Sequence, residues 1–279
     1  MKSLAALPPR MHGRSSLSTL AASSFLEGSK LKHFEALDEA AKQVDRSGLP
    51  VTLCRINKNP TSPPDASSVR LLLIRHGEAE HNVFSDNFKG EGESSFHPDC
   101  PIDPFLTEKG LSQAKALIPQ TSALVPQPSL ILTSPLKRAT QTALAAFPDG
   151  RSFMCSHLLT EGSNGVREDM ISDGESLSKF FPSVDYSAYN EDCDIAAEHA
   201  ITPNSDLVFS KRKLMVRSDD FLRQIQGLKD EHRVIGVATH SQWLQSFCNF
   251  SLNFEDASES LEWFGTGELR VVDVEFRHK

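Results

Sequence analysis

Short apolar runs alternate with segments of helical spacing along most of the chain. Runs of strand length lie at residues 69–74, 130–132, 151–155, 234–238 and 267–276. Apolar positions with helical spacing lie at residues 106–117, 134–147, 214–228 and 242–250. Buried strands that alternate with helices predict an α/β fold with a mostly parallel sheet. The polar stretch at 156–209 is too long for an ordinary loop, so we expect it to be functional or partly helical.

A Pro- and Ser-rich segment at residues 59–68 precedes this pattern and is the best candidate boundary. It predicts an N-terminal extension at 1–68 and one domain at 69–279. Apolar spacing within 31–49 predicts a short helix in the extension. Residues 1–26 are Ser-rich and basic, with no acid before Glu27, which suits an organellar transit peptide. A partly disordered polar tail fits the same composition slightly better.

Composition excludes several classes of protein. A formal net charge of -8 gives no footprint for nucleic acid or for an anionic membrane, so we expect neither as a partner. No apolar run reaches the length of a membrane span. The five cysteines are scattered, so neither a disulfide framework nor a cysteine zinc site is expected. We therefore expect a cytoplasmic protein, with a mitochondrion or chloroplast as the alternative if the N-terminus is a transit peptide.

Four basic side chains are expected at one edge of the sheet. Arg75 and His76 follow the first apolar run, and His240 follows the run at 234–238. Arg138 lies in the first turn of a helix that Ser134 and Pro135 are expected to open, where free N–H groups attract anions. Ligands of parallel sheets bind at the carboxyl ends of the strands. Arg matches two phosphate oxygens, and neutral imidazole is a nucleophile near pH 7, so the set predicts phosphoryl transfer.

These residues lie in three of four motifs that resemble one known family. The motifs are LLLIRHGE at 71–78 with Asn82 after it, LTEKG at 106–110, TSPLKRATQT at 133–142 and VATHS at 237–241. In order and spacing they are similar to the histidine phosphatase superfamily, also called phosphoglycerate mutase-like. The resemblance implies a three-layer sandwich in which helices flank the sheet. It also implies His76 as nucleophile, Arg75, Arg138 and His240 as the phosphate pocket, Asn82 as a further contact, and no metal or organic cofactor.

The acid of the reaction is less well marked. VRE at 166–168 and FPSVDY at 181–186 resemble the plant and fungal branch of the family, which favours Glu168 as the catalytic acid. Glu161 is the rival, because the spacing of this segment departs from the usual one.

The resemblance favours a phosphatase over a mutase. Mutases usually carry Trp-Asn after the first motif and Arg-His-Tyr-Gly after the acid, and this chain has His81-Asn82 and Glu168-Asp169-Met170. We expect a histidine acid-type phosphatase that hydrolyses a phosphomonoester, with a phosphorylated small molecule or a phosphoprotein as substrate. A phosphoglycerate mutase-type phosphotransferase and a catalytically weak module that binds a phosphorylated ligand are the alternatives.

Other residue sets have simpler interpretations. His76, His81, His97 and Cys100 fit no standard zinc spacing, so no metal site is expected. Trp243 and Phe247, four residues apart on a predicted helix, are expected in the core. Residues 83–105 and 156–209 form two long insertions that are expected to lie over the site and to determine specificity. The substrate and the oligomeric state are not readable from the chain.

Overall fold

The computed structural model describes residues 28–58, 60–91, 93–148, 151–162, 165–194, 207–256 and 258–277. The expected transit peptide or polar tail at 1–26 lies outside these residues. Across the described part of the chain, no helix is long and apolar enough to cross a membrane.

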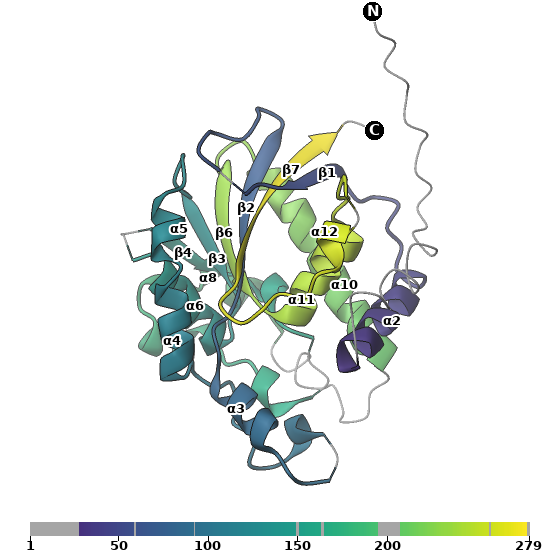
Figure 1. Ribbon diagram of the computed structural model, residues 1–279, viewed down its shortest axis with the longest axis vertical. Coiled ribbons are helices and arrows are strands. Elements are labelled where there is room, and N and C mark those ends of the chain that lie inside the picture. The colour runs from purple at the N-terminus through teal and green to yellow at the C-terminus, as the bar shows by residue number, and fades with distance from the viewer. Residues whose placement is uncertain are drawn as a thin grey trace, which may run out of the picture.

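A seven-stranded sheet forms the centre of the molecule, in the order β1-β7-β2-β6-β3-β4-β5 (Figure 1). The strands are β1 (Val51–Ile56), β2 (Ser68–Arg75), β3 (Leu130–Thr133), β4 (Ser152–Cys155), β5 (Val184–Asp185), β6 (Val234–Thr239) and β7 (Leu269–Arg277). Neighbours from β2 to β5 are parallel, and only β7 runs antiparallel to the strands on both its sides. The predicted α/β fold with a mostly parallel sheet is confirmed, and all five predicted strands are present.

Helices cover both faces of this sheet. The helices of the described residues are α2 (Ser29–Ala41), α3 (Glu80–Asn87), α4 (Glu108–Lys115), α5 (Ile118–Ser122), α6 (Lys137–Ala146), α7 (Gly174–Phe180), α8 (Ser187–Asp192), α10 (Leu207–Leu228), α11 (Ser241–Ser246) and α12 (Ser258–Leu261), of which α3 lies beyond the end of the sheet (Figure 1). Short 3-10 turns lie at Ser94–Phe96, His157–Leu159 and Arg167–Asp169. The helix predicted over 242–250 is α11, which continues as a π-helical turn at Phe247–Ser251.

The side chains of β2 show how the three layers are held together. Leu71 and Leu73 enter a core that contains Phe221 of α10 and Trp243 of α11. Leu72 and Ile74 point to the opposite face and enter a second core, formed with α6, α7 and α8. Successive strand residues face opposite sides, so a run that is apolar throughout belongs to a strand covered on both faces.

Trp243 and Phe247 lie in the first core with their rings stacked at 4.9 Å between centroids. The prediction that these two residues are core is confirmed.

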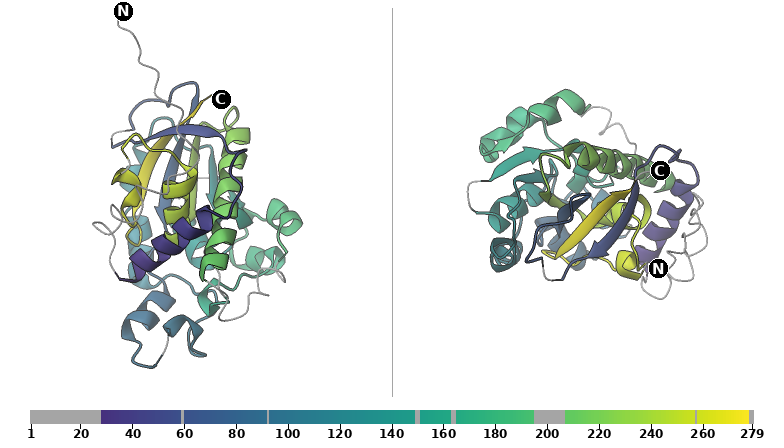
Figure 2. Two further views of the ribbon diagram at one scale, coloured as in Figure 1. Left: turned by 90° about the vertical axis from the view of Figure 1, so that its right-hand side faces the viewer. Right: turned by 90° about the horizontal axis from the view of Figure 1, so that it is seen from above.

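The described part of the expected N-terminal extension packs on the same sheet. Helix α2 lies against α10 (Figure 2), and β1 pairs with β7 from Val51 opposite Arg277 to Ile56 opposite Val272. The helix predicted within 31–49 is present as α2. The division of the chain at residue 68 stays a prediction.

The predicted start of the helix that carries Arg138 is wrong. Helix α6 begins at Lys137, and its N-cap is Leu136, which has no capping side chain. Ser134 lies too far upstream to cap the helix, and its hydroxyl bonds to His240 instead. The carboxylate of Asp103, from the insertion at 83–105, accepts the N–H of Lys137 at 2.9 Å. A residue more than thirty positions away in the sequence therefore caps this helix.

Candidate active site

The two predicted histidines lie side by side at the carboxyl edge of the sheet. β2 and β6 are parallel neighbours in which Arg75 lies opposite Thr239. The next residues are His76 and His240, and the N–H of His76 donates to the carbonyl of Thr239 at 3.0 Å. The centroids of the two imidazole rings are 5.1 Å apart. The parallel register therefore places both rings in one site.

His76 is held in a defined orientation. Its side chain is 3 % exposed, and its Nδ1 lies 2.7 Å from the carbonyl oxygen of Gly77. A carbonyl can only accept, so Nδ1 carries the proton and Nε2 keeps its lone pair. Burial, followed by the charges of Arg138 and Arg75, holds the pKa of His76 well below its usual value. The ring is therefore neutral, with Nε2 available as a nucleophile.

Gly77 is required at its position for steric reasons. A Cβ atom there would lie 2.4 Å from the carbonyl oxygen of Gly110, at the start of α4. The close approach of these two backbones allows the chain to turn directly after His76.

His240 is held by a hydrogen bond with Ser134, the residue predicted to cap a helix. Its Nε2 lies 2.8 Å from the hydroxyl of Ser134, at the end of β3. Its Nδ1 is buried and has no hydrogen-bond partner among the described residues. Burial and then the charge of Arg138 hold the pKa of His240 well below its usual value. The ring is neutral, and one nitrogen is left for a further partner.

The two predicted arginines lie beside these rings, and only some of their N–H groups have hydrogen-bond partners within the described residues. Arg75 donates from Nη1 to the carbonyl of Phe264 at 2.7 Å. Arg138, 1 % exposed, donates from Nη1 to the carbonyl of Glu168 and from Nη2 to Asp169, both at 2.6 Å. The Nε atoms of both arginines are buried without a partner in the described part of the chain. Unpartnered buried donors are costly, so this cluster of N–H groups fits an anionic ligand.

Asn82 lies at the start of α3, where the structure gives its side chain two contacts. Its Oδ1 accepts the N–H of Ala79 at 2.9 Å, and its Nδ2 lies 3.1 Å from Nε2 of His81. The ring of His81 in turn lies 5.8 Å from that of His76. His81 has no role among the residues predicted from the sequence, and the signal that could have found it is its position beside Asn82, shortly after the first motif.

Glu168, the favoured acid, is buried at the junction of the two insertions. Its carboxylate is the acceptor for the hydroxyl of Ser95 at 2.5 Å and for the thiol of Cys100 at 3.3 Å. Burial and then the charge of Asp169 raise the pKa of Glu168 above its usual value. A carboxyl group that retains its proton to higher pH suits a general acid.

Glu161, the rival, has a different set of contacts. Its carboxylate accepts the backbone N–H groups of Gln242 at 3.1 Å and Trp243 at 3.0 Å, where α11 begins. It also accepts the N–H of Gly162 at 3.0 Å. Burial and then the charge of Asp169 raise the pKa of Glu161 as well. The oxygens of this carboxylate are therefore occupied by backbone donors.

The two insertions meet above this edge of the sheet. Arg167 donates from Nε to the carbonyl of Cys100 at 2.8 Å, and the N–H of Asp103 donates to the carbonyl of Arg167 at 3.4 Å. Segments 83–105 and 156–209 thus contact each other around Glu168. Their expected role in specificity stays a prediction.

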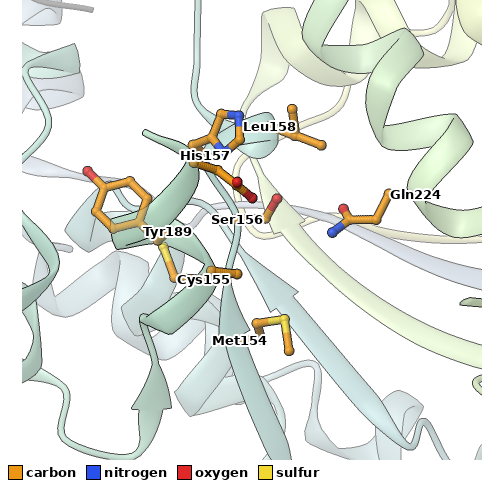
Figure 3. Close-up of a pocket in the computed structure, with 9 residues that line it drawn as sticks. Met154, Cys155, Ser156, His157, Leu158, Tyr189 and Gln224 are labelled. Atoms are coloured by element: carbon orange, nitrogen blue, oxygen red, sulfur yellow. The ribbon is translucent and has the colours of Figure 1, made fainter. Parts of the chain in front are cut away.

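A separate small pocket lies beyond the end of β4 (Figure 3). Its lining residues are Met154, Cys155, Ser156, His157, Leu158, Ala188, Tyr189, Asp192 and Gln224. None of them is an arginine or lysine, and none was predicted for the site, so this pocket is not the expected phosphate pocket. Within the described ranges, no group of three or more His, Cys, Asp or Glu side chains is arranged to hold a metal ion.

Comparison with known proteins agrees with the family that the motifs suggested. The model of the histidine phosphatase superfamily (branch 1) matches residues 71–278, and the chain belongs to this superfamily. No curated protein sequence matches the chain.

Several solved structures are similar to the chain. A putative alpha-ribazole-5'-P phosphatase from Escherichia coli is 20% identical, with 75% of this chain and 94% of that one covered and a TM-score of 0.46. A mutant phosphoserine phosphatase from Entamoeba histolytica, in complex with phosphoserine, is 17% identical over 73% and 89%, with a TM-score of 0.44. Mycobacterial glucosyl-3-phosphoglycerate phosphatase in complex with VO3 is 19% identical over 73% and 90%, also at 0.44. The family match is to branch 1 of the superfamily and gives no support to a plant or fungal branch.

Proposed function

We propose that the protein is a phosphatase that hydrolyses a phosphomonoester through a phosphohistidine intermediate at His76. The observation that carries the proposal is the hydrogen bond from His76 Nδ1 to the carbonyl of Gly77. This bond leaves Nε2 unprotonated beside His240, Arg75 and Arg138.

In the first half of the reaction the phosphoryl group moves from the substrate to the enzyme. The Nε2 lone pair of His76 attacks phosphorus, a P–N bond forms, and the P–O bond to the leaving group breaks. Glu168 gives its proton to the leaving oxygen, so an alcohol departs. The raised pKa of Glu168 supports this assignment, because the acid must be protonated when the substrate binds.

In the second half, water removes the phosphoryl group from His76. The Glu168 carboxylate takes a proton from water, the water oxygen attacks phosphorus, and the P–N bond breaks. Inorganic phosphate leaves, and both His76 and Glu168 return to their starting states. Each proton is accounted for within the site, and no metal or organic cofactor takes part in the proposed cycle.

The phosphoryl group is held by the donors that the structure leaves without partners. Arg75 and Arg138 each present a buried Nε–H, and His240 presents Nδ1. The two guanidinium groups neutralise the charge on the equatorial oxygens and the neutral His240 donates a hydrogen bond, and together they keep the phosphorus in line with Nε2 of His76. We assign Asn82 a supporting contact in the same pocket, because it lies next to His81 at the start of α3.

We propose a histidine acid-type phosphatase whose substrate is a phosphorylated small molecule, with a phosphoprotein as the alternative, in the cytoplasm. Relationship to the plant and fungal branch rests on the VRE and FPSVDY segments alone.

Hydrolysis of p-nitrophenyl phosphate by the full chain tests the proposal, with the same protein carrying His76→Ala as control. We expect release of inorganic phosphate by the wild type only. If transfer instead depends on a bisphosphate primer, the protein is a mutase. If a folded wild-type protein hydrolyses none of several phosphomonoesters, the catalytic assignment is wrong and a ligand-binding module remains.

A further inference from the structure

Asp169 is a buried acid that the proposed reaction does not use directly. Its side chain is 5 % exposed, and its Oδ1 lies 2.6 Å from Nη2 of Arg138, which is also buried. The attraction within an ion pair so shielded from water offsets the cost of desolvation only if its geometry is good and further hydrogen bonds satisfy the other polar groups of both partners. The short distance meets the first condition.

The backbone next to Asp169 completes the contact with the same guanidinium. Nη1 of Arg138 donates to the carbonyl of Glu168 at 2.6 Å. The 3-10 turn Arg167–Asp169 therefore holds both terminal nitrogens of Arg138 and also carries the carboxyl group of Glu168. The phosphate-binding arginine and the proton donor are linked through one short turn.

Arg138 still has donors for a ligand after these two bonds form. A guanidinium has five N–H groups, of which Asp169 and the Glu168 carbonyl take two. The Nε–H of Arg138 is among those left, and it has no partner within the described residues. The ion pair with Asp169 therefore fixes the plane of the guanidinium without blocking the phosphoryl group.

We propose that Asp169 is a positioning residue that acts both on Arg138, the arginine that binds the phosphoryl group, and on Glu168, the proton donor. This inference rests on the function proposed above. It assigns Asp169 two effects: its hydrogen bond sets the orientation of Arg138, and its charge acts on the neighbouring carboxyl group of Glu168.

The groups around Glu168 determine the second effect. After burial, Asp169 is the largest influence that raises the pKa of Glu168, and the hydrogen bonds from Ser95 and Cys100 lower it. Arg167 lies on the same turn, and Arg138 approaches from α6. On the far side, Asp169 also interacts with Glu161 and with the buried Lys211 of α10.

Two substitutions separate the effects of Asp169. Asp169→Asn keeps an oxygen that can accept from Arg138 but removes the charge. Asp169→Ala removes both the charge and the acceptor. Asp230→Asn is the matched control, because Asp230 lies outside both insertions with its side chain 83 % exposed.

We would measure kcat and KM for p-nitrophenyl phosphate across the pH range for all three variants. For Asp169→Asn we expect KM within about twofold of wild type, with the decline of kcat at high pH moved to lower pH. Asp169→Ala should show the same movement and a KM raised about tenfold, because Arg138 also loses the hydrogen-bond acceptor that orients it. Asp230→Asn should match the wild type.

A readout that does not need turnover completes the test. The carboxyl carbon of Glu168 is titrated by NMR in 13C-labelled protein and assigned by its loss in Glu168→Gln. We expect Asp169→Asn to lower the titration midpoint of Glu168. An unchanged midpoint with an unchanged pH–kcat profile in folded Asp169→Asn would overturn the inference. Absence of hydrolysis by the wild type would overturn the proposed function alone, and the NMR titration would then decide on Asp169.

Discussion

The carboxylate of Glu161 accepts the backbone N–H of Trp243 at 3.0 Å, at the point where α11 begins. It accepts the N–H of Gln242 as well, so Glu161 satisfies N–H groups that a helix start leaves without partners. Glu168, in contrast, is bound by two side chains of the facing insertion. The two candidate acids therefore have different structural tasks, and substitution should separate them.

Glu161→Gln should mainly reduce stability. The amide keeps one acceptor oxygen but loses the charge that faces the start of α11, and we expect a loss of about 1–2 kcal/mol in the free energy of unfolding. Glu168→Gln should retain stability and lower kcat by roughly 10²–10⁴-fold, because it cannot donate a proton to the leaving group. Denaturant melts and kcat of both variants are the measurements. Loss of turnover in well-folded Glu161→Gln, with Glu168→Gln active, would transfer the acid role to Glu161.

Removal of either arginine of the proposed phosphate pocket should impair turnover. We expect Arg75→Ala and Arg138→Ala each to lower kcat/KM by about 10²-fold or more, since each removes a cation from the developing charge on phosphorus. Near-normal kcat/KM in both variants would contradict the proposal that these two arginines bind the phosphoryl group.

The two arginine variants should differ in stability. Arg138→Ala leaves Asp169 as a buried charge without its partner, a change that typically costs about 3–5 kcal/mol. The Arg75 side chain donates to a backbone carbonyl, that of Phe264, so Arg75→Ala should be milder. Thermal melts of the two variants measure this difference, and an equal loss of stability would argue against the buried ion pair.

Ser95, which lies in the insertion that faces Glu168, should influence the pKa of this catalytic carboxyl group. Its hydroxyl donates to Glu168 and lowers the pKa of that carboxyl group. Ser95→Ala removes the donor, so the decline of kcat at high pH should move to higher pH, the opposite direction to Asp169→Asn. Ser94→Ala is the control, because the Ser94 hydroxyl bonds to that of Ser85 on the exposed surface. A pH–kcat profile that is identical in both serine variants would show that the contact does not act on Glu168.

His33, a partly buried residue of α2, should make the protein sensitive to mild acid. Burial and then the charge of Lys211 lower the pKa of His33 from 6.5 to about 4. As the pH falls from 6.5 toward 4, the unfolded chain takes up a proton at His33 and the folded protein does not. The free energy of unfolding should therefore fall by up to about 1.4 kcal/mol per pH unit for this residue.

His33→Gln isolates this contribution, because glutamine does not titrate. Relative to its own value at pH 7, the variant should lose less stability at pH 5 than the wild type does. Denaturant melts at the two pH values provide the comparison. An equal loss in both proteins would mean that His33 is protonated in the folded state.

The sheet could be predicted from the sequence because its central strands are apolar on both faces. Strands β3 and β6 are buried throughout and β2 is buried up to Ile74, which gives continuous apolar runs. Strand β1 at the edge carries exposed positions within six residues, and β5 has only two residues, so neither produces such a run. Helix α3 has no buried residue among those the structure describes, and its sequence therefore lacks an apolar stripe.

The site was predictable only where topology alone positions a residue. His76 and His240 follow adjacent parallel strands, and the register of these strands brings the two residues together without any contact between their side chains. The contact of His240 with Ser134 joins residues 106 positions apart, and the ion pair of Arg138 with Asp169 depends on the path of a long insertion. Local patterns carry no information on such contacts, and the capping preference of serine pointed to the wrong role for Ser134.

Trapping of a phosphoenzyme with p-nitrophenyl phosphate, quenched in alkaline denaturant, tests the central claim most directly. The wild type should acquire a phosphoryl label that is stable in base and labile in acid, as expected for phosphohistidine, and His76→Ala should acquire none. A phosphohistidine label retained in His76→Ala, or hydrolysis by the wild type with no trapped label, would contradict His76 as the nucleophile.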